Sequence, residues 1–217
     1  MDGIATPHGV DVARGFLTNG SLQGFVFLAQ RLAVGKRVLV ERPTYDRPLK
    51  ILRELGADVV GLDCDEEGLD PDALATALRS GEKPAFLYLI PTFQNPSGRT
   101  LSEERRLRIV ELAREHDVLV LEDDPYGEIH FGDPPPPALR APDPDVIYLG
   151  TFSKTIAPGI RVGWLAEPAD VSGLLLMVKD AAGIHGDRTN VDKGTTITAA
   201  CPGGTAATQP SVRRGHR

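Results

Sequence analysis

Short apolar runs alternate with amphipathic stretches from Ser21 to about Gly173. The apolar runs are rich in β-branched residues and are bounded by Gly, Pro or Asp, which is typical of buried strands in an α/β sheet. The predicted strands are RVLVE (37–41), DVVGL (58–62), AFLYLI (85–90), VLVLE (118–122), VIYLG (146–150) and RVGWLA (161–166). The stretches between the strands predict helices over 21–33, 46–55, 71–79 and 103–116.

Residues that commonly cap helices stand at most of these helix ends. We expect Ser21 as the first N-cap, Gly56 as a C′ residue, Asp70 with Pro71 at an N-cap and N1, and Ser102 as the last N-cap. The helix over 103–116 should bury one apolar stripe and turn its arginines to solvent. That stripe comprises Leu107, Ile109, Val110, Leu112 and Ala113, and the outward arginines are Arg105, Arg106 and Arg108.

The repeated strand–helix order predicts a doubly wound, mostly parallel sheet with helices on both faces, a three-layer α/β/α domain. In such sheets ligands bind beyond the carboxyl ends of the strands, so the loops that follow the strands are the place to look for chemistry. The four prolines of 134–137 predict a stiff loop segment that acts as a spacer.

Composition excludes several other classes of protein. The 217 residues hold 24 Lys+Arg and 30 Asp+Glu, a net charge of −6, which does not suit a nucleic-acid-binding surface. Cys64 and Cys201 form neither a disulfide framework nor a CxxC metal site, and the five histidines are scattered. No apolar run reaches the roughly 20 residues of a membrane span, and no signal peptide is visible, so we expect a cytoplasmic protein.

The segment 187–217 departs from this pattern because it contains few sizeable aliphatic residues. Its five basic and two acidic residues give it a net charge of +3, which leaves −9 on the remainder of the chain. Since so few apolar side chains cannot offset the entropy cost of ordering, we expect a disordered tail.

The stretch TFSKTIAPGIRVGW (151–164) carries the strongest chemical signal. Lys154 follows a predicted strand among hydroxyl side chains, one of them Ser153, and Arg161 comes seven residues later. Hydroxyl groups and a guanidinium are good phosphate ligands, and a partly desolvated lysine near a cation has a lowered pKa and becomes nucleophilic. This combination suggests pyridoxal 5'-phosphate (PLP) as cofactor. The alternative is a surface lysine in a connection between two strands.

This stretch resembles the cofactor-lysine motif of class I/II aminotransferases, which are fold-type I PLP enzymes. The resemblance implies that Lys154 holds PLP as a Schiff base and moves the substrate's Cα proton. LEDDPYGE resembles the family's D-x-x-Y element, so Asp123 would face the pyridine nitrogen and Tyr126 the phenolic oxygen. Asp124, before Pro125, is expected to serve only a turn or cap.

Three further segments resemble family landmarks in the same order along the chain. PTFQNPSGRT (91–100) resembles the N-P-T-G loop, with Ser97 in place of Thr, and implies that Asn95 binds the phenolic oxygen. ERPTYD (41–46) implies that Tyr45 stacks on the pyridine ring. TNGSLQG (18–24) implies a phosphate site at a helix start. The residues of that site are Ser21, Leu22 and Gln23, together with Ser153 and Arg161.

The resemblance covers residues 10–186 and is strongest to the branch of 2-aminoadipate and kynurenine aminotransferases and MocR-type regulators. It implies a large PLP-binding domain over 1–186, incomplete at its N-terminus, followed by a non-family tail over 187–217. We expect the family's small C-terminal domain to be missing, and with it the arginine that grips the substrate carboxylate. Our hypothesis for the change in sequence character after residue 186 is a truncated or frame-shifted gene product.

Three functions remain open. The first is a PLP-dependent aminotransferase that acts on amino-acid and 2-oxo-acid substrates, as a homodimer, with no metal, nucleic-acid or membrane partner. The second is the PLP-binding sensor domain of a transcription regulator, and the third is an inactive remnant of the fold. The S-x-x-K spacing of Ser80 and Lys83 is dismissed, because the partner motifs of penicillin-binding enzymes are absent from the sequence.

Overall fold

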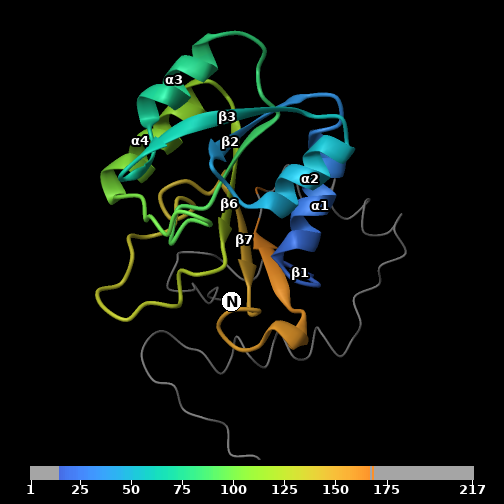
Figure 1. Ribbon diagram of the computed structural model, residues 1–217, viewed down its shortest axis with the longest axis vertical. Coiled ribbons are helices and arrows are strands. Elements are labelled where there is room, and N and C mark those ends of the chain that lie inside the picture. The colour runs from blue at the N-terminus through green and yellow to red at the C-terminus, as the bar shows by residue number, and fades with distance from the viewer. Residues whose placement is uncertain (1–14, 167, 169–217) are drawn as a thin grey trace, which may run out of the picture.

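The computed structural model describes residues 15–166 and residue 168 of the chain (Figure 1). Within this part, eight strands form one mixed sheet in the order β1-β8-β7-β6-β5-β2-β3-β4. The strands are β1 (Gly15–Thr18), β2 (Arg37–Arg42), β3 (Asp58–Asp65), β4 (Gly68–Leu69), β5 (Phe86–Leu89), β6 (Leu119–Asp124), β7 (Ile147–Thr151) and β8 (Gly163–Ala166).

The central part of the sheet is parallel, as the strand–helix order predicts. Strands β7, β6, β5, β2 and β3 run in the same direction, whereas β8, β1 and β4 pair antiparallel with their neighbours. The register sets Tyr88 beside Leu121 and Thr151 beside Gly163. The first pairing brings β5 next to the acidic end of β6, and the second brings the chain before Lys154 next to β8.

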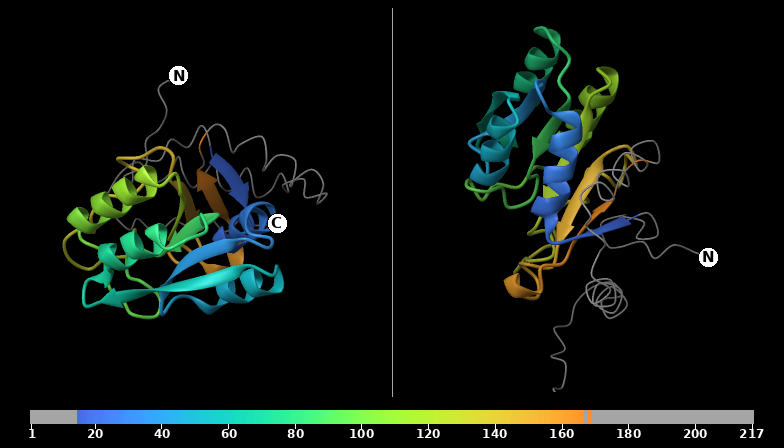
Figure 2. Two further views of the ribbon diagram at one scale, coloured as in Figure 1. Left: turned by 90° about the horizontal axis from the view of Figure 1, so that it is seen from above. Right: turned by 90° about the vertical axis from the view of Figure 1, so that its right-hand side faces the viewer.

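Four helices cover the two faces of the sheet in the described part of the chain (Figure 2). They are α1 (Ser21–Leu32), α2 (Asp46–Glu54), α3 (Pro71–Arg79) and α4 (Glu103–Glu115). One buried cluster joins α1 and α2 to the sheet through residues such as Phe25, Leu52 and Tyr88. A second joins α3 and α4 through Leu74, Ile109 and Val120. The predicted three-layer α/β/α class is therefore confirmed.

The predicted strands and helices all occur, with ends that differ by at most three residues. Three helix ends are as expected: Gly56 has φ +70°, Asp70 accepts from the Asp72 N–H at 2.9 Å, and Ser102 accepts from the Arg105 N–H at 3.3 Å. The edge strands β1 and β4 lack a predicted counterpart, because they are short and have no alternating pattern.

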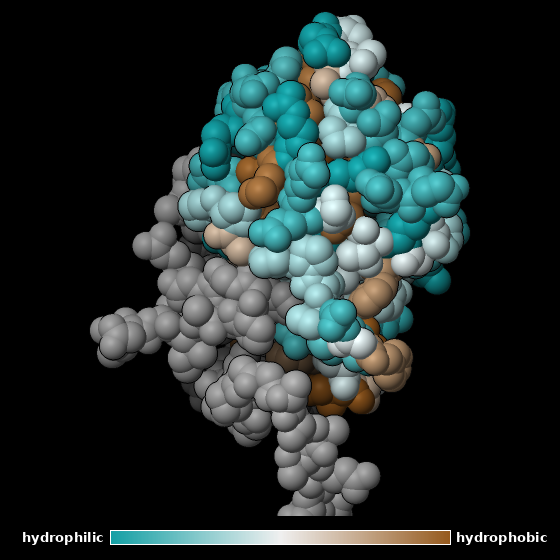
Figure 3. Space-filling model, turned by 90° about the vertical axis from the view of Figure 1, so that its left-hand side faces the viewer, coloured by the Kyte–Doolittle hydropathy of each residue, from teal (hydrophilic) through white to brown (hydrophobic). Residues whose placement is uncertain are grey.

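Helix α4 differs from the prediction at three positions, since the Arg105 side chain, expected to face solvent, is only 18% exposed and pairs with Asp65 of β3. Arg106 was expected to face solvent but is only 2% exposed, whereas Leu107, expected in the buried stripe, is 43% exposed. Arg106 stands three and four residues before Ile109 and Val110, which puts it on their face of the helix. Its guanidinium is satisfied there by the carbonyls of Pro91 and Pro137, at 3.0 and 3.1 Å. The outer surface over α3 and α4 is mostly hydrophilic (Figure 3).

Predictions for the two ends of the chain concern residues that the structure does not describe. The tail over 187–217 and the start of the chain before Gly15 lie outside the described residues. Among the helices of the described part, none is long and apolar enough to cross a membrane.

Candidate active site

The first turn of α1 offers backbone N–H groups at one end of the sheet. Gly20, with φ 83°, is the N-cap and provides no side-chain hydrogen bond, so the expectation that Ser21 is the N-cap is wrong. Ser21 is instead the first helical residue, since glycine alone readily adopts the backbone angles of the preceding position. The Gln23 side chain accepts from the Asn19 N–H at 2.8 Å, outside the helix. Such an uncapped N-terminus favours an anion.

Strand β8 approaches the start of α1 very closely. A Cβ built on Gly163 would lie 2.5 Å from the Gly20 carbonyl carbon and 2.6 Å from the Ser21 nitrogen, so only glycine fits. Two residues earlier, Arg161 has left-handed backbone angles, with φ 48°. Its guanidinium donates to the Asn19 carbonyl at 3.0 Å. The structure thus brings Arg161 to the helix start, as the phosphate-site prediction requires.

The end of β7 brings Ser153 toward the same region. Thr151 pairs with Gly163 of β8, and its hydroxyl lies 3.0 Å from the Ser153 hydroxyl. The Ser153 N–H donates to the Thr151 hydroxyl oxygen at 3.2 Å, which fixes the turn that leads to Lys154. Hydroxyl, guanidinium and helix amides from three elements therefore surround one end of β8.

Lys154 follows in this turn and extends toward Tyr126. Its ammonium nitrogen lies 5.9 Å from the centroid of the Tyr126 ring, within the range of a cation–π contact. The side chain is exposed, so the partial desolvation expected of the lysine is not seen in this chain alone. Lys154 and Tyr126 are nevertheless brought together as predicted from their motifs.

Asp123 is the buried carboxylate of the site. It is 7% exposed, and its Oδ2 accepts a hydrogen bond from the Tyr88 hydroxyl at 2.7 Å. Its other oxygen, Oδ1, is buried and has no hydrogen-bond partner among the described residues. Burial raises the pKa of Asp123 to about 6, against the opposing effect of the Tyr88 hydrogen bond and with a further increase from the charge of Asp124. A buried oxygen without a partner is costly unless a ligand supplies a donor.

The neighbours of Asp123 on β6 serve the opposite face of the sheet, since side chains alternate along a strand. Asp124 accepts from the Gly127 N–H at 2.9 Å and from the Tyr148 hydroxyl at 3.0 Å, which confirms its expected turn role. Glu122 accepts from the backbone N–H groups of Leu139 and Arg140 at 3.0 and 3.1 Å. These two carboxylates hold loops, and Asp123 alone faces the α1 side.

Tyr126, Asp123 and Tyr45 are near enough to influence one another. Tyr126 is half-buried, and its pKa is raised first by burial, then by the charge of Asp123 and by Tyr45. Tyr45 immediately precedes α2 and packs against the α1–α2 side of the core. The D-x-x-Y motif and the stacking candidate therefore come from different elements and lie close together.

Asn95 lies in the loop between β5 and α4, half-buried. Among the described residues, no hydrogen bond joins Asn95 to Tyr126. The adjacent Gln94 organises the loop. Its Nε2 donates to the Pro43 carbonyl at 2.9 Å, and its Oε1 accepts from the Ser97 N–H at 2.9 Å. Gln94 thereby ties the Asn95 loop to the segment that carries Tyr45.

Three residues that support the site were missed from the sequence: Tyr88, Gln94 and Glu41. Glu41 is 1% exposed, accepts from the Ile90 N–H at 2.8 Å, and has a pKa raised by burial to about 8. Tyr88 and Glu41 stand within or next to apolar runs, whereas Gln94 lies in the polar loop over 91–100. A polar group in such a run is the signal that could have found Tyr88 and Glu41, because a buried polar group needs a partner.

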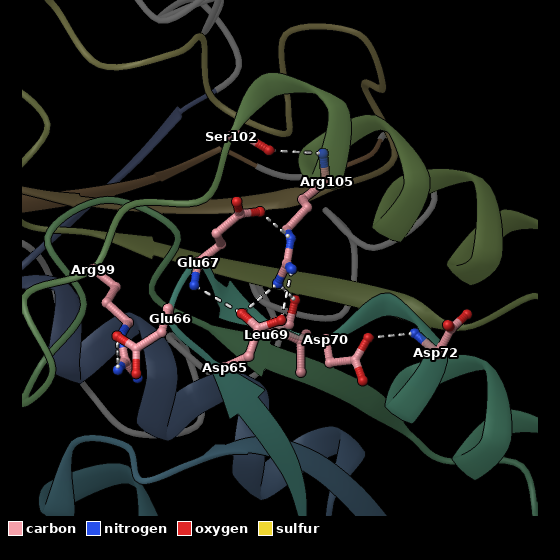
Figure 4. Close-up of polar contacts among 9 residues, drawn as sticks. All are labelled: Asp65, Glu66, Glu67, Leu69, Asp70, Asp72, Arg99, Ser102 and Arg105. Atoms are coloured by element: carbon pink, nitrogen blue, oxygen red, sulfur yellow. Dashed lines mark hydrogen bonds and ion pairs between the residues drawn. The ribbon is translucent and has the colours of Figure 1, made fainter.

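A second polar cluster lies where the β3–β4 hairpin meets α4 (Figure 4). Arg105 pairs with Asp65 at 2.6 Å and Glu67 at 3.0 Å, and Arg99 pairs with Glu66 at 2.9 Å. Arg105 also borders a pocket of about 370 Å³. Because both arginines are already neutralised by carboxylates, this cluster attaches the hairpin to α4 and is not a second candidate site.

A family model for class I and II aminotransferases matches residues 10–199. The chain belongs to this aminotransferase family. The matched region begins at the residue where the resemblance was placed and extends beyond residue 186, into residues outside the described part.

Aminotransferases and a transcriptional regulator are among the relatives found by sequence. The chain is 41% identical over 159 residues to aromatic-amino-acid aminotransferase 1 of Thermococcus litoralis, covering 70% of this chain and 38% of that protein. It is 37% identical over 170 residues to the uncharacterized HTH-type transcriptional regulator YisV of Bacillus subtilis, covering 75% and 34%.

A solved structure shares the same fold. The α-aminoadipate aminotransferase LysN of Thermus thermophilus, complexed with N-(5'-phosphopyridoxyl)-L-leucine, matches with a TM-score of 0.75 and 36% identity, covering 79% of this chain and 46% of that one. The chain therefore spans less than half the length of each of these relatives.

Proposed function

We propose that this chain forms the cofactor-binding part of a PLP-dependent aminotransferase, which transfers an amino group between an amino acid and a 2-oxo acid. The observation that carries the proposal is the buried, unpartnered Oδ1 of Asp123. A protonated pyridine nitrogen would supply both the missing donor and the opposite charge. The phosphopyridoxyl ligand in the LysN structure supports the same cofactor class.

The other residues of the site fit the remaining parts of PLP. The phosphate would be held by the first-turn N–H groups of Ser21, Leu22 and Gln23, by the Ser153 hydroxyl and by Arg161. Lys154 would take the aldehyde, Tyr45 the ring face, and Asn95 with Tyr126 the phenolic oxygen. In this proposal, one chain would supply a complementary group for each part of the cofactor.

When bound, PLP supplies an electron sink for the pair of electrons released as the substrate's Cα–H bond breaks. The carboxylate of Asp123 stabilises positive charge at the ring nitrogen, which keeps that nitrogen protonated. With PLP bound, the amine of Lys154 would serve as the general base that takes the proton from the substrate Cα. Arg161 and the α1 amides hold the phosphate so that this proton transfer occurs at a fixed position.

Reduction with borohydride followed by peptide mass spectrometry tests the assignment of the lysine. We expect a phosphopyridoxyl group on the peptide that contains Lys154, and its loss in Lys154→Ala. Lys50→Ala is the matched control, since Lys50 is exposed on α2 and pairs with Asp46 of the same helix at 3.1 Å. Equal labelling of wild type and Lys154→Ala would contradict the assignment.

Turnover needs a separate measurement, because the chain spans less than half of its relatives. Incubation with 2-oxoglutarate and a panel of amino acids should yield glutamate if the described site suffices for transamination. Cofactor labelling at Lys154 without glutamate formation would support cofactor binding and reject activity for this chain alone.

The similarity to the HTH-type regulator YisV favours a second candidate, a PLP-binding regulatory domain. This candidate predicts that amino acids change the absorbance of bound PLP without the release of a 2-oxo acid. The two candidates are separated by the appearance of product, because both require the same cofactor-binding residues.

The expected homodimer is supported by the exposure of Lys154 and Arg161. A reactive lysine gains from exclusion of water, and a second copy over this end of the sheet would provide it. Sedimentation equilibrium of the PLP-loaded protein tests this, with a dimer expected and a monomer at all concentrations contradicting it.

A further inference from the structure

Asp123, on the face of β6 toward α1, is paired with a buried tyrosine that the cofactor contacts above do not use. Tyr88, on the adjacent strand β5, is fully buried, with 0% exposure, and its hydroxyl donates to Asp123 Oδ2 at 2.7 Å. The register sets Tyr88 beside Leu121, two residues before Asp123. The tyrosine therefore reaches along the sheet to the carboxylate from a strand whose position is fixed.

Aromatic packing fixes the direction of that hydroxyl. The ring of Phe25 on α1 packs edge-on against Tyr88, with centroids 5.1 Å apart and planes at 68°. Phe25 also packs edge-on against Phe86, with centroids 6.4 Å apart. A ring held in this way in a close-packed core does not swing to another acceptor, so Asp123 Oδ2 is the partner that its hydroxyl keeps.

The consequence falls on the second oxygen of Asp123. With Oδ2 engaged by Tyr88, rotation of the carboxyl group would break a buried hydrogen bond, so Oδ1 stays the oxygen without a partner. The same hydroxyl favours the ionised form of the carboxyl group, against burial and the charge of Asp124.

We propose that Tyr88 is a positioning residue, which holds Asp123 with Oδ2 occupied and leaves Oδ1 for the ring nitrogen of the cofactor. This inference rests on the proposed function and adds a residue that acts on the cofactor only through Asp123. It predicts that the role of Tyr88 depends on a nitrogen in the cofactor ring.

A matched control lies on the other face of β6, where Asp124 is paired with a second buried tyrosine, Tyr148. The Tyr148 hydroxyl donates to Asp124 Oδ2 at 3.0 Å, and Tyr148 is also buried. Tyr148→Phe therefore removes the same group from the neighbouring aspartate without touching Asp123. A general loss of core stability should be similar in Tyr88→Phe and Tyr148→Phe.

The test compares two cofactors in the wild type and both variants. One is PLP, and the other is the analogue in which carbon replaces the pyridine nitrogen. We expect Tyr88→Phe to weaken PLP binding on the order of tenfold and analogue binding by less than about twofold, because the lost hydrogen bond supports a charged group. Tyr148→Phe should leave the affinity for PLP and the affinity for the analogue unchanged.

A second measurement needs no cofactor. Titration of the Asp123 carboxyl carbon by NMR in the free protein should show a higher pKa in Tyr88→Phe, whereas Tyr148→Phe leaves it near the wild-type value. Asp124 and Tyr88 act on this titration, and Tyr126 is a further titratable group nearby, whose own pKa is raised by the charge of Asp123.

Equal weakening of both cofactors in Tyr88→Phe, or an unchanged Asp123 pKa, would overturn the positioning role while leaving the proposed function intact. Failure of the wild-type chain to bind PLP would overturn both. These outcomes are distinct, since the first requires a wild type that binds PLP more tightly than the analogue.

Discussion

Buried carboxyl groups are the residues that set the chemistry of this chain. Asp123 faces the candidate cofactor, whereas Glu122 and Glu41 hold backbone N–H groups at the ends of their strands. Burial raises the pKa of Glu122 to about 7 and that of Glu41 to about 8. Near neutral pH Glu41 is therefore largely protonated and Glu122 about half protonated, so both change the stability of the fold as pH rises.

Glu41→Gln should change how stability depends on pH. The pKa of Glu41 rises from 4.5 to about 8 on folding, so its contribution to the free energy of unfolding is present below 4.5 and is lost as pH rises toward 8. In that window wild type loses up to about 1.4 kcal/mol per pH unit through this group, and glutamine loses none. Urea unfolding between these pH values should therefore show that the free energy of unfolding of the variant rises relative to that of wild type as pH increases.

Glu54→Gln is the control for this experiment, because Glu54 is exposed on α2. It should keep the pH dependence of wild type. A Glu41→Gln curve parallel to wild type over the whole range would show that Glu41 ionises at the same pH in the folded and unfolded chain.

Gly163→Ala should disturb the phosphate end of the site. The added Cβ would lie 2.5 Å from the Gly20 carbonyl carbon, in backbone that cannot move aside alone. Overpacking of this kind costs about 1–3 kcal/mol, and displacement of the first turn of α1 should weaken PLP binding as well. Urea unfolding and PLP titration measure the two effects.

Gly159→Ala provides the comparison, since nothing lies within 4 Å of a Cβ at that exposed position. It should leave stability within about 1 kcal/mol of wild type and PLP affinity unchanged. A Gly163→Ala variant with wild-type affinity would contradict the role assigned to the close approach.

At the scale of whole elements, a single buried arginine holds together the loops behind the site. Besides Pro91 and Pro137, Arg106 donates to the carbonyl of Leu101 at 3.0 Å and to the hydroxyl of Thr92 at 2.9 Å. These acceptors flank the loop that carries Asn95. Helix α4 therefore holds both ends of that loop through the hydrogen bonds of Arg106.

Arg106→Met should destabilise the protein by about 3–5 kcal/mol, because it leaves several buried carbonyl groups without donors. Arg108→Met is the control, since Arg108 is exposed and, in the described part of the chain, pairs with Glu111 and Glu115 of its own helix. It should change stability by less than about 1 kcal/mol. Equal losses of urea midpoint in the two variants would contradict the structural role of Arg106.

The same helix shows where prediction from sequence succeeds and where it fails. Hydrophobic periodicity and caps located α4 and its neighbours, because apolar spacing and Ser or Asp caps act locally. The inward side of Arg106 was missed because residue type was weighed above helical spacing. The short edge strands β1 and β4 were missed because their pairing depends on contacts with distant strands.

Among the site residues too, those with a local sequence signal were predicted and those whose role depends on distant strands were missed. Lys154, Asp123 and Tyr126 were predicted from motifs, and the structure brings them close together. Tyr88 and Gln94 were missed because their roles depend on which strand lies beside which. The register that sets Tyr88 beside Leu121 is a property of the assembled sheet and is not visible in either segment alone.

Across the whole molecule, the candidate site joins parts of the chain that are far apart in sequence. Asn19 and Arg161 are 142 residues apart and share a hydrogen bond, and Gly163 packs against Ser21. A ligand that binds all these groups adds links between the first and last strands of the described fold. Cofactor binding should therefore stabilise the folded chain as a unit rather than one loop.

PLP at 100 times its dissociation constant should raise the free energy of unfolding by about 2.7 kcal/mol, since it binds only the folded chain. Thermal unfolding should show a higher midpoint, and hydrogen exchange should show added protection at the start of α1, at the end of β7 and at β8 together. Asp123→Asn should reduce the gain, because an amide supplies no negative charge to the ring nitrogen. Lys50→Ala should retain the full gain. Protection confined to the turn around Lys154 would instead indicate that PLP reacts with an exposed lysine and does not occupy the site proposed here.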